Sequence, residues 1–203
     1  MVKSGYALIL VCAVAAGCGG GGGDSGISAE TRGAFEGVYA LETATENPSS
    51  CDTEGPSNLE SFSDRQFVAV GIHVLTTTGL QISSCADDAA CATIAAKIAG
   101  GQGWGSQWGW FMSSEVSPDE VAGFSASTGF LTDGVCMQRV YTDISFSRQG
   151  DAVRLETRAK SLADVPADHD TCWVDPTTQR QEAAARPCTS LAVLTGTKLG
   201  PLP

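Results

Sequence analysis

Basic residues are scarce in this sequence. The chain has 12 Lys and Arg residues against 23 Asp and Glu residues, which gives a formal net charge of −11 at pH 7. Proteins that bind nucleic acid use clusters of Lys and Arg to displace counterions from phosphates, and proteins that bind anionic lipid by charge need basic clusters as well. We therefore expect no nucleic-acid partner and interpret the acidic balance as a solubilising surface.

Several motifs that would indicate a metal or a nucleotide are also lacking. There are only two histidines, no C-x2-C pair and no H-x3–5-H spacing, so the cysteines do not form a zinc motif. No Gly-x-Gly-x-x-Gly stands between a predicted strand and a predicted helix, where a dinucleotide site would need it. We expect no metal and no cofactor.

The chain also has no apolar run long enough for a membrane-spanning helix, which needs about 20 residues. Its N-terminus has instead one positive charge, Lys3, followed by a short apolar run over residues 6–16. This pattern is typical of a secretory signal peptide. The string Ala15-Ala16-Gly17-Cys18 at the end of that run resembles the lipobox of bacterial lipoproteins. In that family signal peptidase II cuts before the cysteine, whose sulfur carries a diacylglyceryl group.

The lipobox resemblance implies a division of the chain into three parts. Residues 1–17 would be the signal peptide, and Cys18 would be the lipidated first residue of the mature protein. Five glycines follow Cys18, and we assign residues 18–33 to a flexible tether. Residues 34–203 are long enough for a single domain with its own core. Glycine, not aspartate, follows Cys18, which by resemblance to sorted lipoproteins of double-membrane bacteria implies the outer membrane.

Eight cysteines are present, and their number and placement point to disulfides. Cys12 lies in the signal peptide and Cys18 is the lipid site, so six remain: Cys51, Cys85, Cys91, Cys136, Cys172 and Cys188. An even number in an exported chain favours pairing, although six cysteines allow 15 pairings. Proximity along the chain predicts Cys85–Cys91 and Cys172–Cys188, which leaves Cys51–Cys136.

Most of the remaining sequence has the alternation of β-strands. The clearest case is a long hairpin over residues 136–147 and 152–162, with Gln149-Gly150-Asp151 as its turn. Further strands are predicted over residues 35–43, 66–75, 80–82, 107–113, 124–131 and 189–199. One helix is predicted over residues 87–99, and two short helices begin at Ser117 and Thr178. The pattern predicts a mainly β domain, an antiparallel barrel or sandwich of about seven or eight strands with one inserted helix and two short helices.

The segment Phe35-Glu36-Gly37-Val38-Tyr39 is similar to the first strand of lipocalins, in which a glycine precedes an aromatic residue by two positions. Lipocalins usually have tryptophan where this chain has Tyr39, and a basic residue on the last strand, for which Lys198 is available. The resemblance covers five residues. It implies a cup-shaped barrel for a small apolar ligand.

Tryptophans provide a second candidate site. Three of the four lie in the glycine-rich segment 100–111, as Trp104, Trp108 and Trp110. Exposed indoles stack on sugar faces, so these residues are candidate ligand-binding residues of a glycan-binding module. The alternative is that they pack inside the domain, with Trp108 and Trp110 on one strand face and Trp104 at the barrel end.

The two histidines provide little evidence for catalysis. His73 lies on an apolar strand face without a nearby nucleophile. His169 lies in a loop with Asp164, Asp168, Asp170 and Asp175, whose spacing does not match an EF-hand, so we expect a solvated acidic loop. We expect a lipid-anchored envelope protein with a non-catalytic binding or structural domain. The alternative is an envelope hydrolase that uses His169 and its neighbouring aspartates.

Overall fold

The protein forms a closed antiparallel barrel of eight strands, in the order β1 to β8, with β8 paired to β1. The computed structural model describes residues 26–57, 67–72, 78–99, 109–130, 136–162 and 174–202. The predicted mainly β fold is confirmed, and the barrel is the correct alternative of the two. None of the helices in these ranges is long and apolar enough to cross a bilayer.

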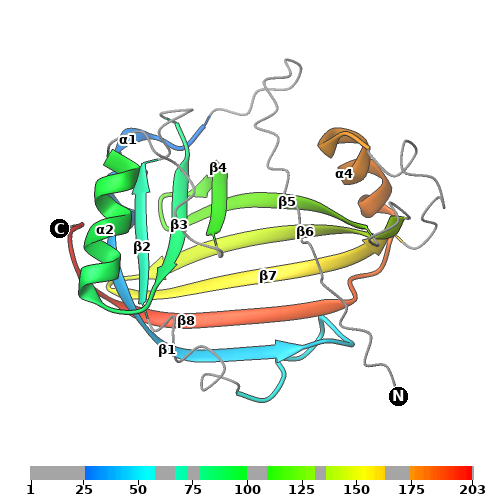
Figure 1. The fold of residues 1–203 in the computed structure, drawn as a ribbon, viewed down its shortest axis with the longest axis horizontal. Helices are drawn as coiled ribbons and strands as arrows, with labels where there is room; N and C mark the ends of the chain where they lie inside the picture. Colours follow the sequence, from blue (N-terminus) through cyan, green and yellow to red (C-terminus); the bar gives the residue numbers. More distant parts are fainter. Residues whose placement is uncertain are drawn as a thin grey trace, which may run out of the picture.

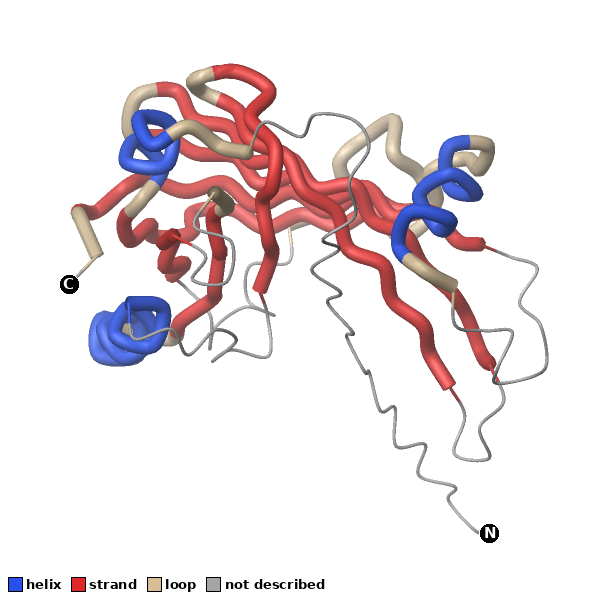
Figure 2. The backbone as a smooth tube through the Cα atoms, turned by 90° about the horizontal axis from the view of Figure 1, so that it is seen from above, coloured by secondary structure: helices blue, strands red, loops and turns tan. Residues whose placement is uncertain are grey.

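The strands differ in length and direction. They are β1 (Gly37–Asn47), β2 (Phe67–Ile72), β3 (Leu80–Cys85), β4 (Gly109–Ser117), β5 (Glu120–Phe130), β6 (Cys136–Gln149), β7 (Ala152–Leu162) and β8 (Ser190–Gly200). The helices within the described ranges are α1 (Ala29–Phe35), α2 (Asp88–Ala99) and α4 (Pro176–Ala184). In Figure 1, β5 to β8 and β1 run along the molecule, whereas β2 to β4 stand across them at one end. Figure 2 shows α2 and α4 at opposite ends of this sheet.

The predicted hairpin is present as β6 and β7, and its alternation builds the barrel core. Ile144 and Phe146 of β6 face inward with Leu155 of β7, and Gly150 makes the turn with a φ of 63°. Strands β2, β3 and β8 contribute further buried side chains, among them Val70, Ile82 and Leu194. A cavity of only about 10 Å³ remains among these inward-facing side chains. This part of the barrel interior is therefore packed with side chains.

Helix α1 packs at one end of the barrel. Phe35 is fully buried, with its ring centroid 5.2 Å from that of Phe146. The Tyr39 hydroxyl donates a hydrogen bond of 2.5 Å to the carbonyl oxygen of Phe35. Lys198 of β8 lies over the Tyr39 ring, 5.8 Å from its centroid, and donates to the carbonyl oxygen of Ala34 at 3.1 Å. The helix is thereby joined to both the first and the last strand.

Two predictions about local structure are wrong. The predicted tether extends to residue 33, but α1 begins at Ala29, with the Ser28 hydroxyl accepting a hydrogen bond from the Thr31 backbone N–H. The helix predicted to begin at Ser117 is instead the turn between β4 and β5, where the Ser117 hydroxyl accepts from the backbone of Asp119. The same short polar residues cap helices and stabilise turns, so the local sequence did not distinguish the two. The other predicted helices are present as α2 and α4.

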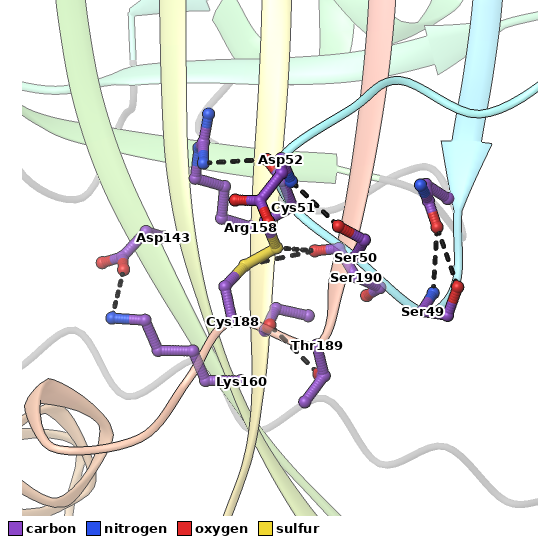
Figure 3. Close-up of a disulfide and its surroundings, with 12 residues drawn as sticks. Ser49, Ser50, Cys51, Asp52, Asp143, Arg158, Lys160, Cys188, Thr189 and Ser190 are labelled. Atoms are coloured by element: carbon purple, nitrogen blue, oxygen red, sulfur yellow. Dashed lines mark hydrogen bonds and ion pairs between the residues drawn. A yellow bond between two sulfur atoms is a disulfide. The ribbon is translucent and has the colours of Figure 1, made fainter.

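Two disulfides are present among the described residues. Cys85–Cys91 joins the end of β3 to α2 with a Cα–Cα distance of 5.1 Å, which confirms that pairing. Cys51 pairs with Cys188 at a Cα–Cα distance of 5.9 Å (Figure 3), so the predicted Cys172–Cys188 and Cys51–Cys136 pairings are wrong. The cause is barrel closure. Because β1 pairs with β8 out to Asn47 and Leu191, the segments that carry Cys51 and Cys188 meet at the same end of the sheet.

Candidate functional site

A cleft of about 240 Å³ lies on the outer face of the barrel, beside α4. We call it the outer cleft. It is lined by small residues of β4 and β5 and by larger side chains of β5, β6, β7 and α4, namely Phe124, Tyr141, Asp143, Glu156, Arg158 and Arg180. Its volume is many times that of the cavity within the barrel core.

Two aromatic rings form the apolar part of the outer cleft. Val121 and Ile144 face the barrel core, so alternation along β5 and β6 places Phe124 and Tyr141 on the outer face. The two rings are stacked, with centroids 5.7 Å apart and an interplanar angle of 17°. Ala183 of α4 belongs to the same apolar cluster. As a result Tyr141 is only 2% exposed although it belongs to the outer face.

The Tyr141 hydroxyl is buried and forms no hydrogen bond of regular geometry with a described residue, although the Asp143 carboxylate lies near it. Burial raises the pKa of Tyr141 to about 12, and the negative charge of Asp143 acts in the same direction. The hydroxyl therefore stays protonated at physiological pH and can donate a hydrogen bond. Leaving a buried polar group unpaired costs about 1–3 kcal/mol. A buried tyrosine that performs only a packing role could avoid this cost by being phenylalanine.

The carboxylates that line the outer cleft form ion pairs with arginine and lysine side chains. Arg158 and Arg154 both bond to Glu156, at 2.5 and 3.0 Å. Burial opposes ionisation of Glu156, but these hydrogen bonds outweigh it and hold the pKa of Glu156 below its usual value. The Lys160 ammonium lies 3.2 Å from an oxygen of Asp143 (Figure 3). Neither carboxylate is left without a cation.

Arg180 differs from the other cations of the outer cleft. Its guanidinium lies over the Phe124 ring, 5.8 Å from the centroid, and it forms no ion pair with a carboxylate of the described residues. Helix α4 holds Arg180 in place over the sheet. The helix is capped by Asp175, and its Glu182 pairs at 2.9 Å with Arg139, a β6 side chain that is 7% exposed.

Of the tryptophan and histidine candidates, Trp110 is the one that the described residues include, and it does not line the outer cleft. Trp110 lies on β4 and packs against the barrel core, as the packing alternative predicts, whereas Trp104 and Trp108 lie outside the described residues. His73, His169, Asp164, Asp168 and Asp170 lie outside them as well, and so do Cys18 and Cys172. Asp175 is the N-cap of α4, where it accepts hydrogen bonds from the backbones of Thr177 and Thr178.

Sequence analysis missed Phe124, Tyr141 and Arg180 as site residues. One signal was available, because the hairpin pattern places Tyr141 among charged and polar residues on its wet face, where a buried aromatic is unexpected. No comparable signal marks Arg180, whose position depends on where α4 packs. No group of three or more metal-ligating side chains is brought together within the described ranges.

Comparison with protein-family models, with curated proteins and with solved structures found no significant match to this chain. The geometry of the outer cleft is thus the observation on which a function can be based.

Proposed function

We propose that this chain is a lipid-anchored cell-envelope protein whose β-barrel domain binds a ligand in the outer cleft, without catalysing a reaction. Cys18 would carry the lipid, and the outer membrane would be its location. The disulfides support export, because such bonds persist in oxidising compartments. The lipid would supply the attachment, since a chain with a net charge of −11 is poorly suited to binding anionic headgroups.

The observation that carries the proposed binding function is the Tyr141 hydroxyl in the outer cleft, which is buried and has no regular hydrogen bond to a described residue. A hydroxyl without a partner in the free protein is readily explained if a ligand supplies that partner. A lipocalin-like barrel would place a basic residue of its last strand beside Tyr39, and Lys198 lies there. Its packed core, with a cavity of about 10 Å³, favours a ligand on the outer face over one in the interior.

A variant with a filled cleft tests this proposal. Ala122 lines the outer cleft, so Ala122→Phe should occupy part of its volume. Ala152→Phe is the matched control, because Ala152 is exposed next to the β6–β7 turn and does not line the cleft. The mature proteins would be screened by ligand-observed NMR against sugars, amino acids, short fatty acids and organic acids.

We expect a small molecule that binds to the wild type to bind to Ala152→Phe as well, and we expect its binding to be lost in Ala122→Phe. Binding that survives Ala122→Phe would place the ligand elsewhere and contradict the proposal. A screen in which the wild type binds none of these classes would also count against it.

A further inference from the structure

We propose that the outer cleft recognises an anionic group, a carboxylate or a phosphate, through the Arg180 guanidinium and the Tyr141 hydroxyl. This inference rests on the proposed binding function of the cleft and names the chemistry of its ligand. Both side chains line the cleft, one from α4 and one from β6.

Tyr141 acts as a hydrogen-bond donor in this scheme. Its hydroxyl stays protonated because it is buried and close to the charge of Asp143. The neighbouring Asp143 carboxylate acts on the hydroxyl through its charge and as a nearby acceptor, but no hydrogen bond of regular geometry joins the two, and Asp143 is held in an ion pair with Lys160. A ligand oxygen in the outer cleft can therefore compete with Asp143 for this donor, and a charged acceptor forms the stronger bond.

Arg180 supplies the charge. Arginine binds carboxylates and phosphates through a planar set of donors, and stacking on the Phe124 ring restricts the orientation of this one. The two carboxylates that line the cleft would repel an anion if they were unpaired. Lys160 neutralises Asp143, and Glu156 bonds to Arg158 and to Arg154, the second of which also pairs with Glu54. Arg180, with no ion pair to a described residue, leaves the site with a positive balance in an otherwise acidic chain.

The size of the outer cleft limits the ligand. A volume of about 240 Å³ is below the roughly 300–1,000 Å³ typical of pockets for drug-sized molecules. The cleft therefore fits one small acid, or one acidic unit of a larger envelope polymer. Both sources present the same group to the two side chains.

The test is calorimetric titration of the mature protein at low ionic strength with inorganic phosphate, glucuronate, a glucuronate-containing polysaccharide and uncharged glucose. We expect binding of at least one anion and none of glucose. A higher affinity for phosphate than for glucuronate, or the reverse, would identify whether the recognised group is a phosphate or a carboxylate. A higher affinity for the polysaccharide than for free glucuronate would identify a polymer as the source.

Two variants separate recognition from packing. Arg180→Gln should weaken anion binding by about tenfold or more, the range of a hydrogen bond to a charged group. The control Lys97→Gln makes the same change of charge on an exposed residue of α2. Tyr141→Phe keeps the stacked ring and should weaken binding by about fivefold while leaving the melting temperature unchanged or raised, because it removes an unpaired buried hydroxyl.

The inference is wrong if no anion binds, if glucose binds as well as glucuronate, or if Arg180→Gln affects binding no more than Lys97→Gln. It is equally wrong if Tyr141→Phe lowers the melting temperature and leaves affinity unchanged, because the hydroxyl would then be structural. The proposed function would survive each of these results if a neutral ligand binds to the wild type and does not bind to Ala122→Phe. The proposed function fails on its own if Ala122→Phe does not weaken the binding of any ligand.

Discussion

At the scale of single residues, the two tyrosines of the described domain show the difference between a structural and a candidate functional side chain. Tyr39 is 1% exposed and its hydroxyl donates to the carbonyl oxygen of Phe35. Tyr141 is equally buried, but its hydroxyl forms no hydrogen bond of regular geometry within the described part of the chain. Burial raises the pKa of both side chains above the usual value of 10. The fold accounts for the Tyr39 hydroxyl, whereas we propose that a ligand in the outer cleft bonds to the Tyr141 hydroxyl.

The raised pKa of Tyr141 predicts a loss of stability at alkaline pH. The folded protein holds the phenol proton up to a pKa of about 12, whereas the unfolded chain releases it near 10. This contribution to folding is therefore fully present below pH 10 and is lost as the pH rises towards 12. Urea unfolding of the wild type should show a steeper decline over that range than unfolding of Tyr141→Phe. Equal slopes for the two proteins would contradict the burial of the phenol.

At the scale of elements, α1 is held by contacts that lie far away in sequence. Lys198 of β8 bonds to the C-terminal turn of the helix at Ala34, and Glu115 of β4 accepts a hydrogen bond of 2.8 Å from the Ser28 backbone at its start. The hydrogen bonds from Ser28, through its backbone and its side chain, hold the pKa of the Glu115 carboxyl group below its usual value. Helix α1 is too short to be stable in isolation, so its presence depends on this docking.

Replacement of Lys198 should loosen α1. Lys198→Met keeps the aliphatic stem and removes the ammonium, so the bond to Ala34 and the contact with the Tyr39 ring are lost. We expect a cost of about 1–3 kcal/mol and faster hydrogen exchange of the amides of residues 29–35. Lys198→Arg should have wild-type stability and wild-type hydrogen exchange, because it keeps the charge. Unchanged exchange in Lys198→Met would show that the barrel end holds α1 without this side chain.

The two disulfides should contribute unequally to stability. Cys51–Cys188 spans 137 residues and Cys85–Cys91 spans 6. The chain-entropy relation gives upper estimates of about 5 and about 2 kcal/mol, respectively. Chemical unfolding of the paired variants Cys51→Ala/Cys188→Ala and Cys85→Ala/Cys91→Ala measures both losses. Equal losses, or a larger one for the short loop, would contradict this ranking.

The pairing of Cys51 with Cys188 leaves two cysteines, Cys136 and Cys172, for a third bond. If all six cysteines of the exported domain pair, these two must bond to each other. Peptide mapping of the unreduced mature protein should recover Cys136 and Cys172 in one linked pair, and alkylation should find no free thiol. Modification of both residues by the alkylating agent would contradict complete pairing.

At the scale of the whole molecule, the sequence predicted what depends on neighbours along the chain. The β6–β7 hairpin and the Cys85–Cys91 bond follow from alternation and proximity, and both are present. Closure of β8 on β1 brings together residues separated by most of the chain, and the local sequence contains no signal for that contact. The Cys51–Cys188 bond and the outer cleft depend on such contacts, since the cleft forms only once α4 packs over β5 to β7.

In the proposed role, a lipid at one end of the tether attaches the barrel domain at the other end to the membrane. Attachment by one acyl chain is only marginal, whereas two or more hold a protein stably. Burial of acyl chains is not screened by salt, but a charge contact would be. The mode of attachment can therefore be read from the response to salt.

Membrane fractionation of cells that express the wild-type chain and Cys18→Ser tests the central claim, that a lipid on Cys18 holds this domain in the envelope. The wild type should remain with the outer membrane through a high-salt wash and should incorporate labelled fatty acid. Cys18→Ser should lose the label and either stay uncleaved or appear in the soluble fraction. Recovery of the wild type mainly as soluble protein, its release by salt, or unchanged labelling of Cys18→Ser would contradict the claim.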